Sequence, residues 1–424
     1  MKRIIYSVKD NARYLLNLCA TFMSQFVSAL SVLILTPLLL ERLGTVHFGT
    51  YGVILNVVLF SSIFDFGLNV GFLKRLIEKK EDTLVLLNTV FFFFLGMFLL
   101  YIPLFFFLFS AGLVKMDDGI PFFALMTSVL IVQNILAAFF DVIIQSVNKI
   151  FLGRSIRVVK LLLEFFGLLL LSVKGSVPVL LIASATVNTL YIIALVYFSR
   201  RELVYCISLK YIQWNALVKH LGYSFWYFLN TVAVSLVFNS QVIMMNMIAG
   251  STGVAKYLMI TRFYDMMRIG LSNFTAVLFP VLASIQEEGR WDQIRSYFFR
   301  SLLRVSIMGG IIFVLVWWIG KPLFLQWSKF NDPEMSRLFM VFSVFILFIV
   351  IDNVSATFLG AFRENKASTL MALVQGALGL GLGYLLLLKM GVTGMALASL
   401  IALLLTNFWF NPWYLVKLIK KHMA

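Results

Sequence analysis

The sequence predicts an all-α polytopic membrane protein with about twelve transmembrane helices in two six-helix lobes. Three observations lead to this prediction. Of the 424 residues, 61% are hydrophobic and only 13% are charged, which is more apolar surface than one soluble core can bury. The apolar residues fall into runs long enough to cross a bilayer. Short motifs also recur in the same order in the two halves of the chain.

The expected helices follow from the lengths of the apolar runs. A hydrocarbon core about 30 Å thick takes about 20 helical residues to cross, so each such run bounded by charged residues or glycine is expected to be one span. The first run is longer than the roughly 7–15 apolar residues of a secretory signal and has no small-residue cleavage pattern after it, so we expect an uncleaved helix. In chain order, the twelve expected spans cover residues 14–40, 48–73, 83–111, 121–147, 156–173, 178–198, 222–249, 255–284, 297–319, 338–362, 367–388 and 395–416.

The distribution of lysine and arginine predicts the orientation of these spans. The termini and the even-numbered loops, counted with the adjoining ends of the spans, carry 25 of the 35 Lys and Arg residues, whereas the odd-numbered loops, counted in the same way, carry eight. Because cytoplasmic loops are enriched in positive charge, both termini are expected in the cytoplasm. This topology accounts for most of the net charge of +16, with the basic loops lying against anionic lipid, so nucleic acid is not an expected partner.

The chain is expected to divide into two similar halves joined by a cytoplasmic linker. The N-terminal lobe covers residues 1–198, the linker residues 199–221 and the C-terminal lobe residues 222–424. Six helices in each half make the two repeats parallel, related by an axis along the membrane normal.

Matched motifs in the two halves support this division. Gly44, in the turn between the first two spans, corresponds to Gly250, 206 residues later, and Tyr51 corresponds to Tyr257 at the same offset. The motif DFGLN similarly faces RIGLS. Each match alone is weak, but together they keep their order along the chain.

The N-terminal half also carries a family resemblance. The stretch LTPLLLERLGTVHFGTYGVILNVV, followed by FDFGLNVG, resembles the polysaccharide-transporter family of the multidrug, oligosaccharidyl-lipid and polysaccharide (MOP) exporter superfamily, which includes the Wzx-type flippases. The most specific part is the pattern of proline, glycine and aromatic residues from Pro37 to Gly52. The resemblance covers the whole chain and implies a MATE-like MOP fold in a bacterial inner membrane.

The resemblance also implies a function. Such proteins carry undecaprenyl-diphosphate-linked oligosaccharides, of O-antigen or capsule type, from the cytoplasmic to the periplasmic leaflet by alternating access through a cationic central cavity. They are transporters and not enzymes. The implied partners are the lipid bilayer, the lipid-linked oligosaccharide, and a polysaccharide polymerase with its chain-length proteins. No cofactor is expected beyond a coupling ion, H⁺ or Na⁺.

The candidate site follows from charges within the expected span 255–284. Arg262, Asp265 and Arg268 share one face of this helix with Asn273, and the polar stripe covers an arc of about 160° along roughly 21 Å of the helix. Charged side chains at that depth cost at least about 2.5–3.5 kcal/mol when they face lipid, so this face is expected to look into protein or water. An internal salt bridge is one interpretation, since both arginines are three residues from Asp265. One carboxylate cannot neutralise two guanidinium groups, however, and the remaining charge suits a diphosphate.

Further carboxylates lie within the expected spans. Asp65 and Asp352 lie well inside their helices, and each has two interpretations: an ion pair with an arginine of the span 255–284, or a proton or sodium site. Asp141 and Glu164 lie nearer to helix ends, where neighbouring polar groups are expected to satisfy them.

Other classes of function fit the sequence less well. A cation-coupled drug exporter of the same superfamily is the main alternative, but it would favour acids over arginines in its cavity. A membrane enzyme such as a polysaccharide polymerase would need a sizeable extracytoplasmic loop, and the largest here is about 18 residues around KPLFLQWSKFNDPEMSR. No catalytic or metal site is predicted, because the histidines lie apart in loops and tails and the two cysteines have no metal-ligand spacing.

Overall fold

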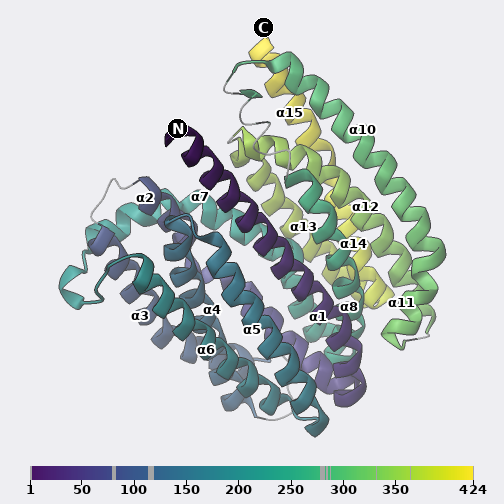
Figure 1. The fold of residues 1–424 in the computed structure, drawn as a ribbon. Coiled ribbons are helices and arrows are strands. Elements are labelled where there is room, and N and C mark those ends of the chain that lie inside the picture. Colours follow the sequence, from purple (N-terminus) through teal and green to yellow (C-terminus); the bar gives the residue numbers. More distant parts are fainter. Residues whose placement is uncertain are drawn as a thin grey trace. The chain divides into compact units, whose positions relative to one another are not determined.

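The computed structural model describes residues 2–78, 83–112, 119–276, 282, 285–286, 288–330, 332–362 and 364–423, and every regular element in them is a helix (Figure 1). The chain divides into two compact units, Met1–Thr231 (unit 1) and Val232–Ala424 (unit 2). The predicted all-α polytopic fold is therefore confirmed for the described part of the chain.

Unit 1 consists of helices broken at a few special positions. In chain order it contains α1 (Lys2–Phe60), the 3₁₀ turn η1 (Ser61–Asp65), α2 (Leu68–Glu78), α3 (Thr83–Ser110), α4 (Ile120–Ser146), α5 (Ile150–Leu171), η2 (Ser172–Lys174), α6 (Val177–Glu202), η3 (Leu209–Tyr211) and the first part of α7 (Trp214–Phe238). α1 includes two of the predicted spans, because Gly44 (φ 75°, ψ 168°) breaks the helix between them. This backbone conformation is open to glycine and strained for other residues.

The second span of unit 1 is interrupted, which the prediction of one helix over residues 48–73 missed. Phe66 (φ 53°) and Gly67 (φ 68°) both adopt left-handed conformations between η1 and α2. A Cβ atom at Gly67 would lie 2.6 Å from the backbone nitrogen of Phe228 in α7, so the break also lets the two helices approach closely. α2 then extends to Glu78, beyond the predicted end.

The segment between α6 and α7 is held by side chains of α3. Asn88 donates from Nδ2 to the carbonyl oxygen of Cys206 (2.9 Å) and accepts from the backbone N–H of Ser208 (2.7 Å). Thr89 accepts from the backbone N–H of Gln213 (3.1 Å). Since Asn88 and Thr89 are both buried, this part of the predicted linker is fixed to unit 1.

Unit 2 contains the rest of α7 and the C-terminal helices. They are α8 (Ser240–Ala276), α10 (Trp291–Leu315), the π-helical turn η4 (Val316–Gly320), α11 (Lys321–Ser328), α12 (Pro333–Ala361), α13 (Asn365–Met390), α14 (Val392–Leu405) and α15 (Asn407–Met423). Gly250 (φ 69°, ψ −174°) breaks α8 in the same conformation as Gly44 in α1. The two glycines matched in the sequence are thus both helix breaks, whereas Gly270 is helical and does not repeat the break at Gly67.

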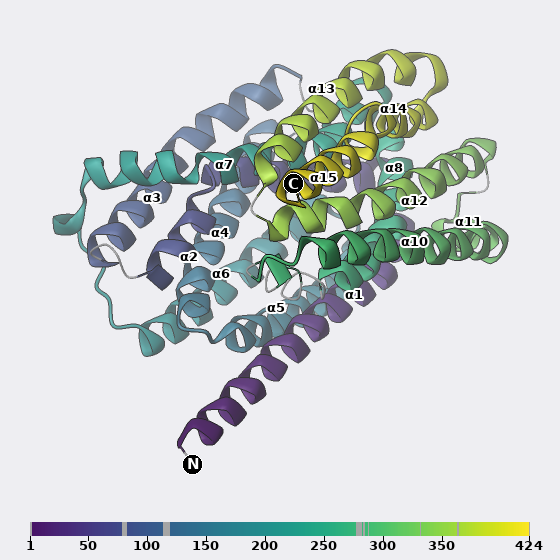
Figure 2. The same cartoon turned by 90° about the horizontal axis from the view of Figure 1, so that it is seen from above.

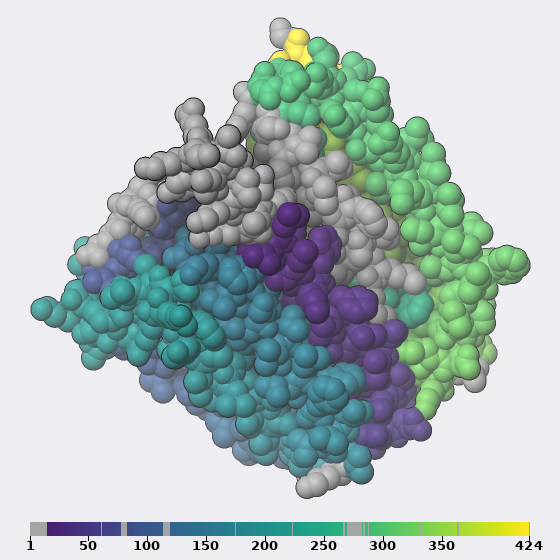
Figure 3. Space-filling model, in the orientation of Figure 1, coloured from purple at the N-terminus to yellow at the C-terminus, as the bar shows by residue number. Residues whose placement is uncertain are grey.

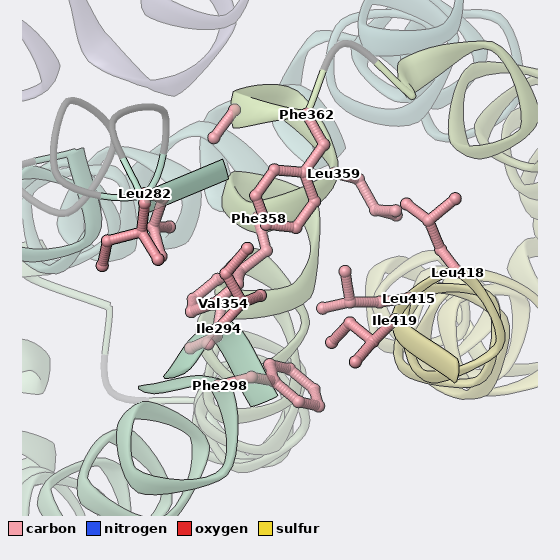
Figure 4. Packing of buried hydrophobic residues seen from close by; sticks show 12 residues of the cluster. Leu282, Ile294, Phe298, Val354, Phe358, Leu359, Phe362, Leu415, Leu418 and Ile419 are labelled. Atoms are coloured by element: carbon pink, nitrogen blue, oxygen red, sulfur yellow. The ribbon is translucent and has the colours of Figure 1, made fainter. Parts of the chain in front are cut away.

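One hydrophobic cluster joins three helices of unit 2. Figure 4 shows side chains of α10, α12 and α15 pointing toward one another, with Phe298, Phe358 and Leu415 each at most 1% exposed. Figures 1 and 2 both show α10 running beside α12. α12 begins where Asp332 accepts a hydrogen bond from the backbone N–H of Met335 (2.8 Å) and Pro333 occupies the first turn, which is a favourable helix start.

The described helices reach into each of the twelve predicted spans, and residues 277–281 and 283–284 of the span 255–284 lie outside the described residues. Nine stretches of the described chain are long and apolar enough to cross a membrane. Two of them, Leu15–Asp65 and Ser224–Asp265, each reach into two predicted spans. The remaining predicted span, 156–173, falls in α5, whose four charged residues set it apart from the nine. The predicted span ends differ from the observed helix ends where the chain has breaks that the apolar pattern does not reveal. One such break is Thr406, between α14 and α15.

The predicted lobe boundaries stay a prediction. Residues 199–202 belong to α6 and residues 214–221 to α7, so the predicted linker is partly helical. The boundary between the two compact units falls within α7, after Thr231. His220 joins the first part of α7 to α2 within unit 1, because it is buried and its Nε2 lies 3.2 Å from the carbonyl oxygen of Leu68.

Candidate functional site

The candidate site is the charged face of α8 beyond the break at Gly250. Arg262, Asp265 and Arg268 are all partly exposed there, and no break interrupts the helix between them. The neighbouring face of the helix is buried, with Tyr257 and Tyr264 at most 2% exposed. The fold therefore keeps the charged side chains out of the packed interior of unit 2.

Buried aromatic residues fix the rotation of α8. The hydroxyl of Tyr264 donates to the carbonyl oxygen of Phe339 in α12 (3.2 Å) and shares a hydrogen bond with Ser343. The ring of Phe263 contacts Phe324 of α11, with centroids 5.2 Å apart. Since these contacts lie on the side facing α11 and α12, the charged face cannot turn inward without breaking them.

Asp265 forms an ion pair with only one of the two arginines. Arg268 donates from Nη2 (3.0 Å) and from Nε (3.1 Å) to the same oxygen, Oδ1, of Asp265. The guanidinium carbon of Arg268 also lies 4.8 Å from the ring centroid of Phe238, the last residue of α7. This distance is typical of a cation–π contact, so the Arg268 side chain is held by a carboxylate and by a ring.

Arg262 has no such neighbour. Within the described part of the chain, no ion pair or hydrogen bond joins its guanidinium to another side chain. The internal salt bridge, one of the two interpretations of these charges, is thus present at Arg268 and absent at Arg262 among these residues. Among the described residues, the three side chains together carry one more positive than negative charge on a helix face of an apolar chain.

Asp65 has a local structural role that its position alone did not suggest. It ends η1, where Oδ1 accepts from the backbone N–H of Gly67 (2.6 Å) and Oδ2 accepts from Nδ2 of Asn69 (3.3 Å). These bonds satisfy donors at the start of α2, as capping carboxylates do. Asp65 therefore stabilises the interruption of the second span.

Asp352, which is half-buried, lies beside a group of buried polar residues in unit 2. Its Oδ1 accepts from Nδ2 of Asn411 in α15 (2.9 Å), so its partner is an amide and not the arginine that the sequence left open. One helix turn earlier, Asn407 donates to Oε1 of Gln375 in α13 (2.8 Å). The Oδ1 atoms of Asn407 and Asn411 are buried and accept no hydrogen bond from a described residue.

The remaining acids have the neighbours that their positions predicted. Asp141 accepts from Nε2 of Gln145 (2.8 Å) and lies 4.0 Å from Nη1 of Arg154. Glu164 forms an ion pair with Lys160 at 2.6 Å. Both are satisfied within unit 1, Asp141 near the C-terminal end of α4 and Glu164 in the interior of α5. The predicted polar residue Asn273 lies in α8, but its side chain is outside the described part of the structure.

Sequence reasoning missed Asn411, the amide partner of Asp352, and Asn407 one helix turn before it. Asn407 and Asn411 lie four residues apart in an apolar segment and therefore share one face of α15. That spacing was a usable signal for a polar site in the C-terminal half. The contact between Arg268 and Phe238 had no such signal, because phenylalanine is common throughout the chain.

Comparison with known proteins identifies the family and the fold of the chain. A family described as "Polysaccharide biosynthesis protein" matches residues 15–286. The chain is 22% identical over 314 residues to the uncharacterized membrane protein EpsK of Bacillus subtilis (strain 168), which covers 70% of this chain and 61% of EpsK. The chain thus spans somewhat under two thirds of the length of this curated relative.

Two solved structures show a similar fold. The lipid II flippase MurJ, in an inward closed conformation, matches with a TM-score of 0.73 and 17% identity over 96% of this chain and 87% of that chain. An inward-facing multidrug resistance MATE family transporter of the MOP superfamily matches with a TM-score of 0.72 and 12% identity over 95% of this chain and 96% of that chain. At these identities the likeness concerns the fold alone.

Proposed function

The chain belongs to the polysaccharide biosynthesis protein family, and from this premise we propose that it is a flippase for undecaprenyl-diphosphate-linked oligosaccharides. The proposed substrates are repeat units of O-antigen or capsule type. They move from the cytoplasmic to the periplasmic leaflet by alternating access. The MOP fold, which this chain shares with a lipid II flippase and a multidrug transporter, supports transport as the general activity.

The uncompensated positive charge of α8 is the observation that carries this proposal. A guanidinium that faces lipid costs at least about 2.5–3.5 kcal/mol, so a spare one in a transmembrane helix requires an anionic partner or water. A diphosphate supplies the anion, and the planar fork of arginine can grip two of its oxygens. A cationic drug would instead be repelled, which argues against the exporter alternative.

The two arginines have different roles in this proposal. Arg262, which has no described partner, binds the diphosphate directly. Arg268 is held in place by Asp265 and by the ring of Phe238, so it is already oriented when the substrate arrives. The Nη2 and Nε atoms of Arg268 both donate to one oxygen of Asp265. The carboxylate of Asp265 therefore competes with the diphosphate for these two donors. This competition favours release of the head group after transport.

Ion coupling is proposed for the buried polar group around Asp352. A coupling carboxylate must exchange a proton or Na⁺ during the cycle, and Asp352 has a single hydrogen bond, from Asn411, among the described residues. The Oδ1 atom of Asn411, which accepts no hydrogen bond from a described residue, adds a neutral amide oxygen beside the carboxylate, and hard cations bind such oxygen ligands. Asp65 is the less favoured candidate, because its two oxygens already cap the start of α2.

We propose that the protein lies in the inner membrane of a bacterium, as its family resemblance implies, and that both termini are in the cytoplasm, as the asymmetry of Lys and Arg indicates. The proposed partners are the lipid bilayer, the lipid-linked oligosaccharide, and a polysaccharide polymerase with chain-length proteins. Reporter fusions after Cys206 and after Lys329 test the orientation. The first should report cytoplasm and the second periplasm, and a reversed pair would contradict the topology.

Complementation tests the function most simply. The gene is expressed in a flippase-deficient bacterium, and lipid-linked oligosaccharide is assayed on each face of the inner membrane. The proposal predicts that oligosaccharide accumulates on the periplasmic face for at least one repeat unit. Failure with several different repeat units, at normal membrane abundance, would favour the drug-exporter alternative.

A further inference from the structure

α5 carries its charged residues on the side that faces away from lipid. Five apolar residues that are 41–72% exposed lie within an arc of about 100° of the helix, and Figure 3 shows the blue-teal residues of α5 at the molecular surface beside the purple residues of α1. The four charged residues lie within an arc of about 120°, whose centre is about 170° from that of the apolar arc. The charged face is therefore turned toward the inside of unit 1. The exposed apolar residues are Val159, Leu162, Leu163, Phe166 and Leu170, and the charged ones are Arg154, Arg157, Lys160 and Glu164.

Two arginines of this face share a single carboxylate. Lys160 is neutralised by its ion pair with Glu164 (2.6 Å), which leaves Arg154, Arg157 and Asp141 of α4. Oδ2 of Asp141 lies 4.0 Å from Nη1 of Arg154, which is too long for a hydrogen bond, and it already accepts from an amide of α4 (2.8 Å). Two arginines and one aspartate again carry one more positive than negative charge, as on α8. Like charges three residues apart on a helix repel each other, so an anion between the two arginines would stabilise both.

The hydrogen-bond donors of these two arginines are largely unused within the described part of the chain. Nε of Arg154 is buried and has no hydrogen-bond partner there. Arg157 is exposed, and no hydrogen bond or ion pair joins it to another described residue. Because buried donors are normally hydrogen-bonded, the two guanidinium groups suit a ligand that accepts several hydrogen bonds at once.

The arginines lie within unit 1, toward the end that the proposed topology places at the cytoplasmic surface. Tyr191 of α6 is close enough to both arginines and to Asp141 to interact electrostatically with all three, so Arg157 extends toward α6 and not toward lipid. Lys149 forms an ion pair with Glu202 at the end of α6. Arg157 follows Lys149 by eight residues, or about 12 Å along α5. A group that enters from the cytoplasmic leaflet can therefore reach it.

We propose that Arg154 and Arg157 form a second phosphate-binding site, in unit 1, which receives the diphosphate of the lipid-linked oligosaccharide from the cytoplasmic leaflet. The role in transport rests on the proposed function, whereas the binding of a phosphate group rests on the two arginines alone. Each guanidinium can grip phosphate oxygens with its planar fork. The phosphate of an anionic lipid head group has the same chemistry, but a diphosphate carries more negative charge and better matches two adjacent guanidinium groups.

The test isolates the site in unit 1 from the charges of α8. Binding of inorganic diphosphate is measured by calorimetry on the purified full-length protein in an uncharged detergent. The starting protein carries Arg262→Gln, Asp265→Asn and Arg268→Gln, and Arg157→Gln is added to it. Arg201→Gln is the matched control, because Arg201 is an exposed arginine in the last turn of α6. Arg157 has no partner among the described residues, so its replacement should leave the protein folded.

The protein without the charges of α8 should still bind diphosphate. Arg157→Gln should weaken this binding at least about tenfold, because it removes charge-assisted hydrogen bonds, whereas Arg201→Gln should leave it unchanged. If the starting protein does not fold, Arg157→Gln in the wild type should remove one of two binding events. No binding by the starting protein, or equal weakening by Arg157→Gln and Arg201→Gln, would overturn the site in unit 1.

Two further measurements identify the source of the phosphate and separate the site from the proposed function. Diphosphate binding should persist in nanodiscs of phosphatidylcholine with and without phosphatidylglycerol. Loss of binding with phosphatidylglycerol would show that lipid head groups occupy the arginines and that the substrate role is wrong. In the complementation assay, Arg157→Gln should fail at normal membrane abundance. Failure of the wild type there, with diphosphate binding intact, would reject the proposed function and leave the phosphate site standing.

Discussion

At the scale of single residues, the three charges of α8 differ in a way that their spacing could not show. Arg262 and Arg268 are both three residues from Asp265, so each could pair with it. In the structure, two nitrogens of Arg268 converge on one carboxylate oxygen and the ring of Phe238 supports the guanidinium. Arg262 has no ion-pair partner among the residues that the structure describes, so in the proposal its charge is the one that meets an anion.

Arg268→Lys should impair transport although it keeps the charge. An ammonium cannot reproduce the two-pronged contact of a guanidinium with a diphosphate. The loss of one charge-assisted hydrogen bond corresponds to about 1.5–3 kcal/mol, or roughly tenfold or more in affinity. Arg268→Ala should be worse. Diphosphate affinity and transport are measured at equal membrane abundance, and full activity of the lysine variant would show that only the charge matters.

Asp352→Asn should reduce transport more than it reduces the amount of folded protein. The variant keeps the shape and can still contact Asn411, but it cannot carry a proton or bind Na⁺ as a carboxylate does. Asp141→Asn is the control, since Asp141 is held by Gln145 and lies near Arg154. Transport and protein level are compared for both variants. An equal loss of folded protein in the two would assign Asp352 a purely structural role.

At the scale of elements, the helix breaks position the site. Gly250 separates the two parts of α8 and Gly44 those of α1, with nearly the same φ and ψ. The matched sequence motifs predicted that these glycines correspond. They did not predict the break at Phe66 and Gly67, because a left-handed phenylalanine has no sequence signal and the close approach of α7 is a tertiary contact.

Gly250→Ala should destabilise unit 2 through the backbone alone. No heavy atom outside the helix lies within 4 Å of a Cβ built at this position, so the cost is the strain of a positive φ, about 1–3 kcal/mol. Gly310→Ala is the matched control, because it is also open but lies in the regular helix α10. Thermal unfolding in detergent should show a lower midpoint for the first variant only. A similar midpoint in both would mean that the break at Gly250 relaxes freely.

The start of α12 should contribute stability that depends on pH. Burial raises the pKa of Asp332, but hydrogen bonds from Lys256 and from the backbone N–H of Met335 outweigh it and hold the pKa below its ordinary value of 3.8. A lowered pKa stabilises the folded protein above the unfolded value, and this contribution is lost as pH falls through the folded value. Asp332→Asn should therefore be less stable than the wild type at pH 7.

The stability difference between wild type and Asp332→Asn should narrow at pH values below about 3.8. Unfolding midpoints of the two proteins at neutral and acid pH measure it. Asp292→Asn is the control, because Asp292 is exposed in the first turn of α10 and should change little at either pH. If the stability difference between wild type and Asp332→Asn did not change with pH, the ion pair between Asp332 and Lys256 would not be its cause.

At the scale of the whole molecule, the membrane spans of the described chain could be predicted, whereas the breaks within them and the details of the site could not. Runs of apolar residues are set by the thickness of the bilayer, so composition predicts twelve spans. The partner of Asp352 is Asn411, 59 residues away, and such a contact depends on how helices pack. Local spacing within α8 predicted one ion pair correctly but could not choose between the two arginines.

The activity of a charge-free variant of α8 tests the central claim most directly. Arg262→Gln, Asp265→Asn and Arg268→Gln are combined, and transport of lipid-linked oligosaccharide is measured together with membrane abundance and the unfolding midpoint. Removing all three charges leaves no buried ion without a partner, so the variant should fold. If the arginines bind the diphosphate, the folded variant should be inactive. Transport near the wild-type rate would instead show that the charges serve only to neutralise one another.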